Sequence, residues 1–323
     1  KMGKRVLVLE QHYIPGGFTH MFARKGYEWD VGVHAIGEMR PKDKSRQILD
    51  WLCKEPIEMI PLGDHYDEFK FPNDETYSLP SDKEIYLKQL QDRFPKQADK
   101  VNLYINTLYK VVQYSKFFFL FKTFPLWLAN ISEKILHVFY RNWWEVTTDQ
   151  LLDELKVEGK LRALLTVHWG YYGSIPKDSS FPMHALTHVH FRNGANYPKG
   201  GAKCFAEQIL ATVIEAGGSV ATNAKVESIL IDQTKAIGVK LENGQKIKGK
   251  KIISATGAKT SINKFIPEKY RKQQWATSIL NIPNSPPYIC MNLGFKGDIK
   301  NAGASSSNQW LLNTWDNNLK YWD

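Results

Sequence analysis

An apolar run near the start of the chain predicts a buried strand. Residues 5–9, RVLVL, form a nearly continuous run of valine and leucine, which is typical of a parallel strand covered on both faces. The run ends at Glu10 and is followed by Pro15 and the pair Gly16-Gly17. Glycines recur at short intervals from 16 to 40, so we expect this stretch to consist largely of loops.

From about residue 41 to residue 110 the pattern becomes polar and helical. Its clearest part is KVNLYINTLYKVV, at 100–112. Apolar side chains recur there at a spacing of about 3.6 residues, which predicts one buried helix face. That face consists of Val101, Ile105, Leu108 and Val112.

The stretch 117–144 is apolar and aromatic but carries Lys122, Pro125, Glu133 and Lys134. A membrane-spanning helix needs about 20 mostly apolar residues with few charges, and this interrupted stretch does not supply them. Two interpretations remain open. The segment is either an amphipathic element lying in a membrane interface or a buried helical cap over a substrate cavity.

The segment from 200 to 257 has the most regular pattern. GGAKCFAEQILATVIEAGG predicts a helix with an apolar face, formed by Phe205, Ile209 and Val213, and a C-terminal cap at Gly217-Gly218. Three short strand patterns follow: SVATN, KVESILID and AIGVKL. Asn243-Gly244 predicts a hairpin turn, and KIKGKKIISATG predicts a last strand that ends at small residues.

Composition adds two points to this picture. The 323 residues are 43% hydrophobic and 24% charged, as expected of a globular chain of about two domains. The aromatic share of 13% suits a bulky apolar ligand as well as an aromatic core. The net charge of +10 favours anionic surfaces or cofactors, but no zinc-finger or RNA-binding motif indicates a nucleic-acid partner.

Cysteine spacing and the N-terminal pattern bear on location. Cys53, Cys204 and Cys290 lie far apart and form no CxxC pair, which argues against a disulfide framework and favours a reducing compartment. The chain opens on a strand pattern and not on a signal peptide. We therefore expect a cytoplasmic protein, with peripheral membrane contact as an open alternative.

Glu10 stands where a dinucleotide-binding fold needs an acid. In such folds a carboxylate at the end of the second strand accepts the ribose hydroxyls, about 20 residues after a glycine-rich phosphate loop. The position about 20 residues before Glu10, where the phosphate loop is expected, would precede the first residue of the sequence. We therefore expect this chain to start partway through a nucleotide-binding unit. Gly16-Gly17 then allows the backbone to pass close to the cofactor.

Three longer stretches carry a family resemblance. VLVLEQHYIPGGFTHMFARKGYEWDVGVHAIGEM resembles the flavin-binding entry of the phytoene desaturase and carotenoid isomerase superfamily of amine oxidase-like flavoproteins. WGYYGSIPKDSSFPMHALTHVHFRNGANYPKGGAKCFAEQI is similar to its retinol saturase branch. GGSVATNAKVESILIDQTKAIGVKLENGQKIKGKKIISATG matches the second half of the FAD site. Against this family, the N-terminal GxGxxG and the C-terminal segment are missing, so we expect a fragment.

The resemblance implies roles for individual residues. It implies that Glu10 binds the adenosine ribose and that the backbone at Gly16-Gly17 runs close to the diphosphate and the flavin. It further implies that Val226 presents backbone groups to adenine and that Ala255, Thr256 and Gly257 approach the diphosphate. Two loops are expected to border the flavin ring or a substrate tunnel; they contain Asp30, Gly32, His34, Tyr197, Pro198, Gly200 and Gly201.

The expected fold is therefore α/β, a discontinuous Rossmann-like FAD-binding domain with an inserted α+β substrate or lid domain. We place the FAD-binding domain at 1–40 and 195–285, and the substrate region at 41–194 and 286–323. The resemblance implies an FAD-dependent oxidoreductase that reduces carbon–carbon double bonds of an apolar polyene, with NAD(P)H as a candidate electron donor. Desaturation or isomerisation remains an alternative, as does a flavin-free lipid-binding module.

The candidates for a catalytic proton donor are His34, His188 and Tyr197. His184, His188 and His190 in HALTHVH also suggest metal ligands, but on a helix His190 points away from the other two and no cysteine completes a site. We therefore predict no metal. Packing or hydrogen bonding is the alternative role of these histidines.

Overall fold

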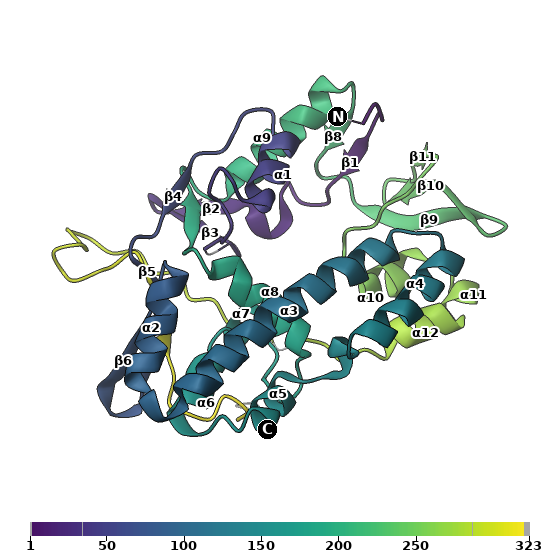
Figure 1. The fold of residues 1–323 in the computed structure, drawn as a ribbon. Coiled ribbons are helices and arrows are strands. Elements are labelled where there is room, and N and C mark those ends of the chain that lie inside the picture. The colour runs from purple at the N-terminus through teal and green to yellow at the C-terminus, as the bar shows by residue number, and fades with distance from the viewer. Residues whose placement is uncertain (1, 34, 286, 320–323) are drawn as a thin grey trace. The chain divides into compact units, whose positions relative to one another are not determined.

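A computed structural model describes residues 2–33, 35–285 and 287–319 of the chain (Figure 1). The chain divides into two compact units. The first comprises residues 1–33, 47–58 and 198–284, and the second comprises 34–46, 59–197 and 285–323.

The first unit is built on a short parallel strand pair. β1 (Leu7–Leu9) pairs with β8 (Ser219–Ala221), which follows directly on α9 (Lys203–Glu215). A Cβ at Gly218 would lie 2.5 Å from the Val6 carbonyl oxygen and 2.8 Å from that of Val213. Only glycine therefore lets α9 turn straight into β8 beside β1. The predicted helix and its glycine cap are confirmed.

The rest of the first unit consists of antiparallel strands and short helices. The predicted turn at Asn243-Gly244 is confirmed, since Gly244 has φ +87° between two paired strands, β10 and β11. The sheet order is β11-β10-β9. The elements are a hairpin of β2 (Met21–Arg24) and β3 (Tyr27–Asp30), β9 (Val226–Asp232), β10 (Lys235–Leu241), β11 (Lys246–Lys248), α10 (Ala258–Thr260), a π-helical turn (Ser261–Phe265), α11 (Glu268–Arg271) and α12 (Gln274–Leu280).

The end of α1 (Lys44–Leu52) and the residues after it pack on α9. The Thr212 hydroxyl donates to the Leu52 carbonyl oxygen at 2.8 Å, and the Lys54 amide donates to that of Gln208 at 3.1 Å. Residues 47–58 therefore group with the first unit, although the sequence assigns them to the insertion. The physical reason is that α9 offers this segment its hydrogen-bonding partners.

The second unit contains a three-stranded sheet. β12 (Asn308–Leu311) runs parallel to β5 (His65–Phe71), which pairs antiparallel with β6 (Glu75–Pro80). A separate strand pair joins β4 (Met59–Pro61) to β7 (Asn196–Pro198). These strands correct the expectation of a helical region over 41–110, because Phe69, Phe71 and other side chains of β5 and β6 alternate into the core.

Helices complete the second unit around that core. α3 packs against α2, α4 and α8. The predicted buried face of the helix at 100–112 is confirmed for Val101, Leu108 and Val112, while Ile105 is partly buried. The helices are α2 (Lys83–Arg93), α3 (Ala98–Lys122), α4 (Leu126–Phe139), α5 (Thr148–Glu154), α6 (Gly159–Thr166), α7 (Trp169–Tyr172) and α8 (Phe181–Phe191).

The predicted parallel strand at 5–9 is confirmed over Leu7–Leu9, but its expected burial on both faces and the strand expected at 252–255 are wrong. β1 is not covered on both faces, because Val6 and Leu7 remain 44% and 43% exposed, and among the described strands only β8 pairs with it. Residues 252–255 form no strand. Ile253 is 91% exposed, and no strand in the described part of the chain pairs with this segment.

Candidate functional site

The first candidate site lies at the carboxyl end of β1. The Glu10 amide donates to the Ala221 carbonyl oxygen at 2.9 Å, and the Glu10 carbonyl oxygen accepts from the Ala224 amide at 2.8 Å. The chain just before Val226, at the start of β9, is thereby fixed beside Glu10. The structure thus brings together two of the residues that the sequence predicts for the adenosine end of FAD.

The Glu10 side chain is half-buried and held by its own turn. One carboxylate oxygen accepts from the His12 amide at 2.8 Å. Within the described residues, the second oxygen has no hydrogen-bond donor, so it can accept a ligand hydroxyl. A carboxylate with a free oxygen at the end of a parallel strand is the group that binds ribose hydroxyls in dinucleotide folds.

The glycine pair follows on the same loop. Gly16 has φ +121° and precedes a short helical turn, Gly17–Thr19, that packs on α9. A Cβ at Gly16 would lie 3.0 Å from the Thr19 hydroxyl oxygen and 3.1 Å from the Ala206 Cβ, whereas one at Gly17 would meet nothing within 4 Å. The loop therefore needs glycine at Gly16 and leaves open space at Gly17, which fits the close approach of a diphosphate.

The two predicted loops around Asp30 and Gly201 meet inside the first unit. The Asp30 carboxylate accepts from the Ala202 amide at 2.9 Å, at the N-terminus of α9. A Cβ at Gly201 would overlap the Met21 sulfur. The carboxylate of the chain itself thus occupies the positive end of this helix. Gly32 packs closely on Phe18, and Gly200 is exposed.

Ala255, Thr256 and Gly257 lie elsewhere in the first unit. Gly257, with φ +89°, precedes α10, and its carbonyl oxygen accepts from the Ser261 amide at 2.9 Å. The Thr256 hydroxyl lies 3.3 Å from that of Ser261. In the described chain no hydrogen bond joins this segment to Glu10 or to Gly16-Gly17.

The second candidate site is a buried cluster of histidines and tyrosines in the second unit. The Tyr104 hydroxyl donates to the Leu165 carbonyl oxygen at 3.0 Å and lies 2.8 Å from Nε2 of His184. Nδ1 of His184 lies 2.9 Å from the Tyr172 hydroxyl. The Tyr66 hydroxyl lies 3.0 Å from Nε2 of His168. The cluster joins β5, α3 and α8 through polar groups that are almost wholly removed from water.

Burial sets the charge of these groups. It lowers the pKa of His184 to about 4, with partial compensation by the Leu165 carbonyl, and it lowers the pKa of His188 to about 3, to which His184 adds. Burial also raises the pKa of Tyr66 and of Tyr86 well above the usual phenol value. At neutral pH the cluster therefore offers uncharged donors and acceptors.

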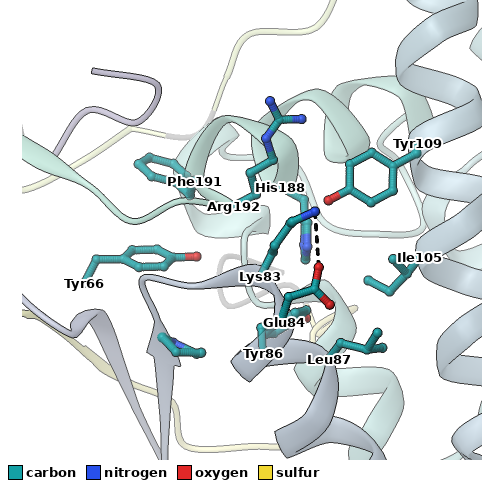
Figure 2. A pocket seen from close by; sticks show the side chains of 11 residues that line it. Tyr66, Lys83, Glu84, Tyr86, Leu87, Ile105, Tyr109, His188, Phe191 and Arg192 are labelled. Carbon is teal, nitrogen blue, oxygen red and sulfur yellow. Dashed lines mark ion pairs between the residues drawn. The ribbon is translucent and has the colours of Figure 1, made fainter. Parts of the chain in front are cut away.

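A small pocket opens beside this cluster, with a volume of about 70 Å³. Figure 2 shows the hydroxyl groups of Tyr66 and Tyr109 pointing toward the same space, near His188 and Lys83. Lys83 pairs with Glu84 at 3.2 Å on its exposed rim. Pockets that enclose whole ligands measure about 300–1,000 Å³, so this pocket has room only for a small group.

The predicted catalytic residues have different positions. His188 lines the pocket. Tyr197 lies on β7, half-buried beside β4, and His34 lies outside the described residues. His190 accepts the Gly37 amide at 2.8 Å, so its ring is directed away from His184. Among the described residues, no group of three metal-binding side chains is present.

Tyr66, Tyr86 and His168 were not predicted from the sequence. Tyr66 and His168 are 102 positions apart, and no fixed spacing connects them, so only the folded chain reveals their contact. The one available sequence signal for Tyr86 was its place four residues before Leu90 on a helix that Asp82 caps.

Comparison with known proteins gives the class. The profile of the family described as flavin containing amine oxidoreductase matches residues 1–320, and the chain belongs to this family. The match confirms the expected α/β flavoprotein fold and supports FAD as the cofactor.

Individual relatives agree with the resemblance seen in the sequence. The chain is 31% identical over 324 residues to an all-trans-retinol 13,14-reductase of Danio rerio, covering 96% of this chain and 53% of the relative. It is 22% identical over 334 residues to a chloroplastic prolycopene isomerase of Daucus carota, covering 98% and 52%. The chain thus spans about half the length of these relatives.

A solved structure supports the fold alone. An oxidoreductase from Methanosarcina mazei matches with a TM-score of 0.58 at 13% identity, over 85% of this chain and 58% of the other.

Proposed function

We propose that this protein is an FAD-dependent oxidoreductase that acts on carbon–carbon double bonds of an apolar polyene. The observation that carries the proposal is the end of β1, where the main chain of Glu10 is hydrogen-bonded to the turn that leads into Val226 and its carboxylate accepts from the His12 amide through one oxygen. The family match supports FAD as the ligand of this end.

Each residue of the first unit has a proposed task in holding FAD. The free oxygen of Glu10 accepts a ribose hydroxyl, and Val226 offers its backbone to the adenine. Gly16 and Gly17 let the backbone pass the diphosphate without a Cβ in the way. Ala255, Thr256 and Gly257 are proposed to face the diphosphate from a second side. When bound, FAD supplies the two-electron redox chemistry.

The proposed substrate is a retinoid or carotenoid, and the proposed direction is reduction. Support comes from the reductase and isomerase names of the relatives. Adding two hydrogens to a double bond consumes two electrons and two protons. We propose NAD(P)H as the source of the electrons. A desaturase consumes no reductant, and an isomerase returns its electrons in each turnover.

The second unit is proposed to bind the substrate. Its pocket is lined by Leu87, Ile105 and Phe191, which offer apolar contact, and by His188. Because burial keeps His188 neutral at physiological pH, it is proposed to hydrogen-bond the substrate; loss of its ring proton would leave an imidazolate, so another group is proposed to donate the proton. Tyr197 and His34 remain proposed alternatives for this task.

Reoxidation of the reduced cofactor tests the proposal. The full-length protein is loaded with FAD, reduced anaerobically with dithionite, and mixed with all-trans-retinol. We expect the oxidised flavin spectrum to return and a product heavier by two hydrogen atoms to form. NADPH or NADH should replace dithionite in repeated turnovers. Bleaching of oxidised flavin by phytoene indicates a desaturase instead, and a flavin that stays reduced with every polyene contradicts the proposal.

We further propose that α4 contacts an anionic membrane surface. Trp127, Ile131, Ile135 and Val138 follow one face of the helix and are 66%, 49%, 53% and 78% exposed. The opposite face, with Ala129 and Leu136, is buried. Lys134 is exposed on this helix and contributes about 1 kcal/mol near anionic lipids, whereas Lys122 already pairs with Glu133 at 2.6 Å.

This stripe also favours the second candidate function, a lipid-binding module without flavin. In the described chain, no helix is long and apolar enough to cross a membrane. Binding of α4 is therefore proposed to be interfacial, with the aromatic and aliphatic side chains in the headgroup region. The cytoplasmic location remains a prediction from the cysteine pattern.

A further inference from the structure

The pocket between α2, α3 and α8 contains buried polar atoms without partners. Nδ1 of His188 and the hydroxyl of Tyr86 make no hydrogen bond within the described chain. Both residues line the pocket, and they are only 8% and 7% exposed. A buried polar atom without a partner is strongly unfavourable, so a hydrogen-bonding partner is expected for each atom beside the pocket.

The neighbouring ring adds a third such atom. His168 packs against His188 with ring centroids 4.9 Å apart, and its Nδ1 is also buried without a partner. Of the other unpartnered buried atoms, those of Tyr77, Trp144 and Trp310 belong to residues that do not line the pocket. The unpartnered atoms at or next to the pocket thus belong to Tyr86, His188 and His168, whose rings lie close together.

The charged side chains around the pocket favour an uncharged ligand over an ionic one. Lys83 pairs with Glu84 at 3.2 Å, and Arg192 lies 3.9 Å from Glu38. Each cation at the rim therefore already has an anion. Burial keeps His188, Tyr86 and Tyr66 uncharged at neutral pH. Neutral donors and acceptors favour a neutral polar group.

We propose that this pocket binds the hydroxyl end of an otherwise apolar alcohol, with Tyr86 donating to the ligand oxygen and the ligand hydroxyl donating to Nδ1 of His188. A hydroxyl both donates and accepts, so one group satisfies both protein atoms. Leu87, Ile105 and Phe191 contact the adjoining carbons. The remainder of a long ligand lies outside the pocket, whose volume is about 70 Å³. The inference rests on the proposed function for the identity of the apolar chain.

Removing the hydroxyl from the ligand, from Tyr86 and from both tests this assignment. Dissociation constants of all-trans-retinol and of its deoxy analogue, which lacks the hydroxyl, are measured by fluorescence on the full-length protein. We expect retinol to bind about three- to tenfold more tightly than the analogue, as for a hydrogen bond of ordinary strength. Tyr86→Phe should remove most of this preference and leave the affinity of the analogue unchanged.

Tyr77→Phe is the matched control, because the Tyr77 hydroxyl is also buried and unpartnered but does not line the pocket. It should retain the full preference. Equal affinity of the two ligands for the wild-type protein, or an unchanged preference in Tyr86→Phe, overturns the inference and indicates a pocket filled by water.

Failure of the proposed function gives a different result. If neither retinoid binds, the polyene assignment fails, and the pocket is tested with 1-hexanol by ligand-observed NMR. Broadening of the alcohol signals by the wild-type protein but not by Tyr86→Phe upholds the pocket. Absent broadening, or equal broadening by both proteins, overturns it.

Discussion

At the scale of single residues, burial determines what the histidines of α8 can do. His184 is fully buried, and each ring nitrogen has a tyrosine hydroxyl within 2.9 Å. His188 has no partner for Nδ1 in the described chain. Two histidines one turn apart thus differ: His184 links helices through hydrogen bonds, and His188 faces a pocket.

Acidification should destabilise the protein through these histidines. In the folded chain the pKa of His184 is about 4 and that of His188 about 3, against an ordinary value of 6.5. Below pH 6.5 the unfolded chain binds more protons, so the free energy of unfolding falls as the pH falls from 6.5 toward these values. The expected slope is about 1.4 kcal/mol per pH unit for each histidine.

Urea unfolding midpoints across this range measure the slope. His188→Gln should reduce it by about one proton, that is about 1.4 kcal/mol per pH unit. His65→Gln is the control, because His65 is exposed at the start of β5 and should leave the slope unchanged. A slope equal in wild type and His188→Gln contradicts a neutral, buried His188.

At the residue scale, prediction from sequence depends on a local pattern. Glu10 is recognisable because it follows an apolar strand and precedes two glycines, and the structure fixes it beside the chain leading to Val226. The Tyr66–His168 contact could not be predicted, because it joins residues 102 positions apart. Such pairs are set by the packing of β5 against the helices.

At the scale of elements, α4 is unusual in its two apolar faces. One face is buried through Ala129 and Leu136, and the other exposes an apolar stripe. The sequence pattern left open a membrane element or an internal cap over 117–144, and membrane contact stays a proposal. Phe118 packs on Tyr114 and Trp144, so its replacement would disturb folding and is a poor test of membrane contact.

Replacement of exposed stripe residues is the sharper test. Trp127→Ser combined with Ile131→Ser and Ile135→Ser should reduce co-sedimentation of the full-length protein with anionic vesicles, because each removes apolar area from the interface. High salt should weaken wild-type binding by screening the lysines. Ile85→Ser, which changes an exposed isoleucine on α2, should have no effect.

A wild-type protein that stays in the supernatant at low and high salt contradicts membrane contact. Vesicle binding that survives the triple substitution contradicts the role of α4.

Element prediction failed where a strand depends on a distant partner. Residues 252–255 have a strand-like sequence, but no described strand pairs with them, and Ile253 is 91% exposed. Conversely, β5 and β6 were not predicted, because they lie in a polar region. Phe69 and Phe71, like Tyr77 and Leu79, are two residues apart, and this spacing was a signal of a strand. Hairpin and helix caps were predictable, because glycine fixes them locally.

At the scale of the whole molecule, each compact unit has one proposed task. The first unit carries the residues proposed for FAD, and the second carries the polar cluster and the pocket. The net charge of +10 suits both a diphosphate cofactor and an anionic membrane. The family profile spans both units.

The central claim is that Glu10 holds the adenosine end of FAD, and titration of the full-length apoprotein with FAD tests it. Glu10→Ala should weaken binding by at least about tenfold, because charge-assisted hydrogen bonds contribute about 1.5–3 kcal/mol each. Glu10→Asp keeps a carboxylate and should lose less. Glu28→Ala, which removes an exposed carboxylate on β3, should bind FAD as wild type does. Equal affinity of wild type and Glu10→Ala would contradict the account.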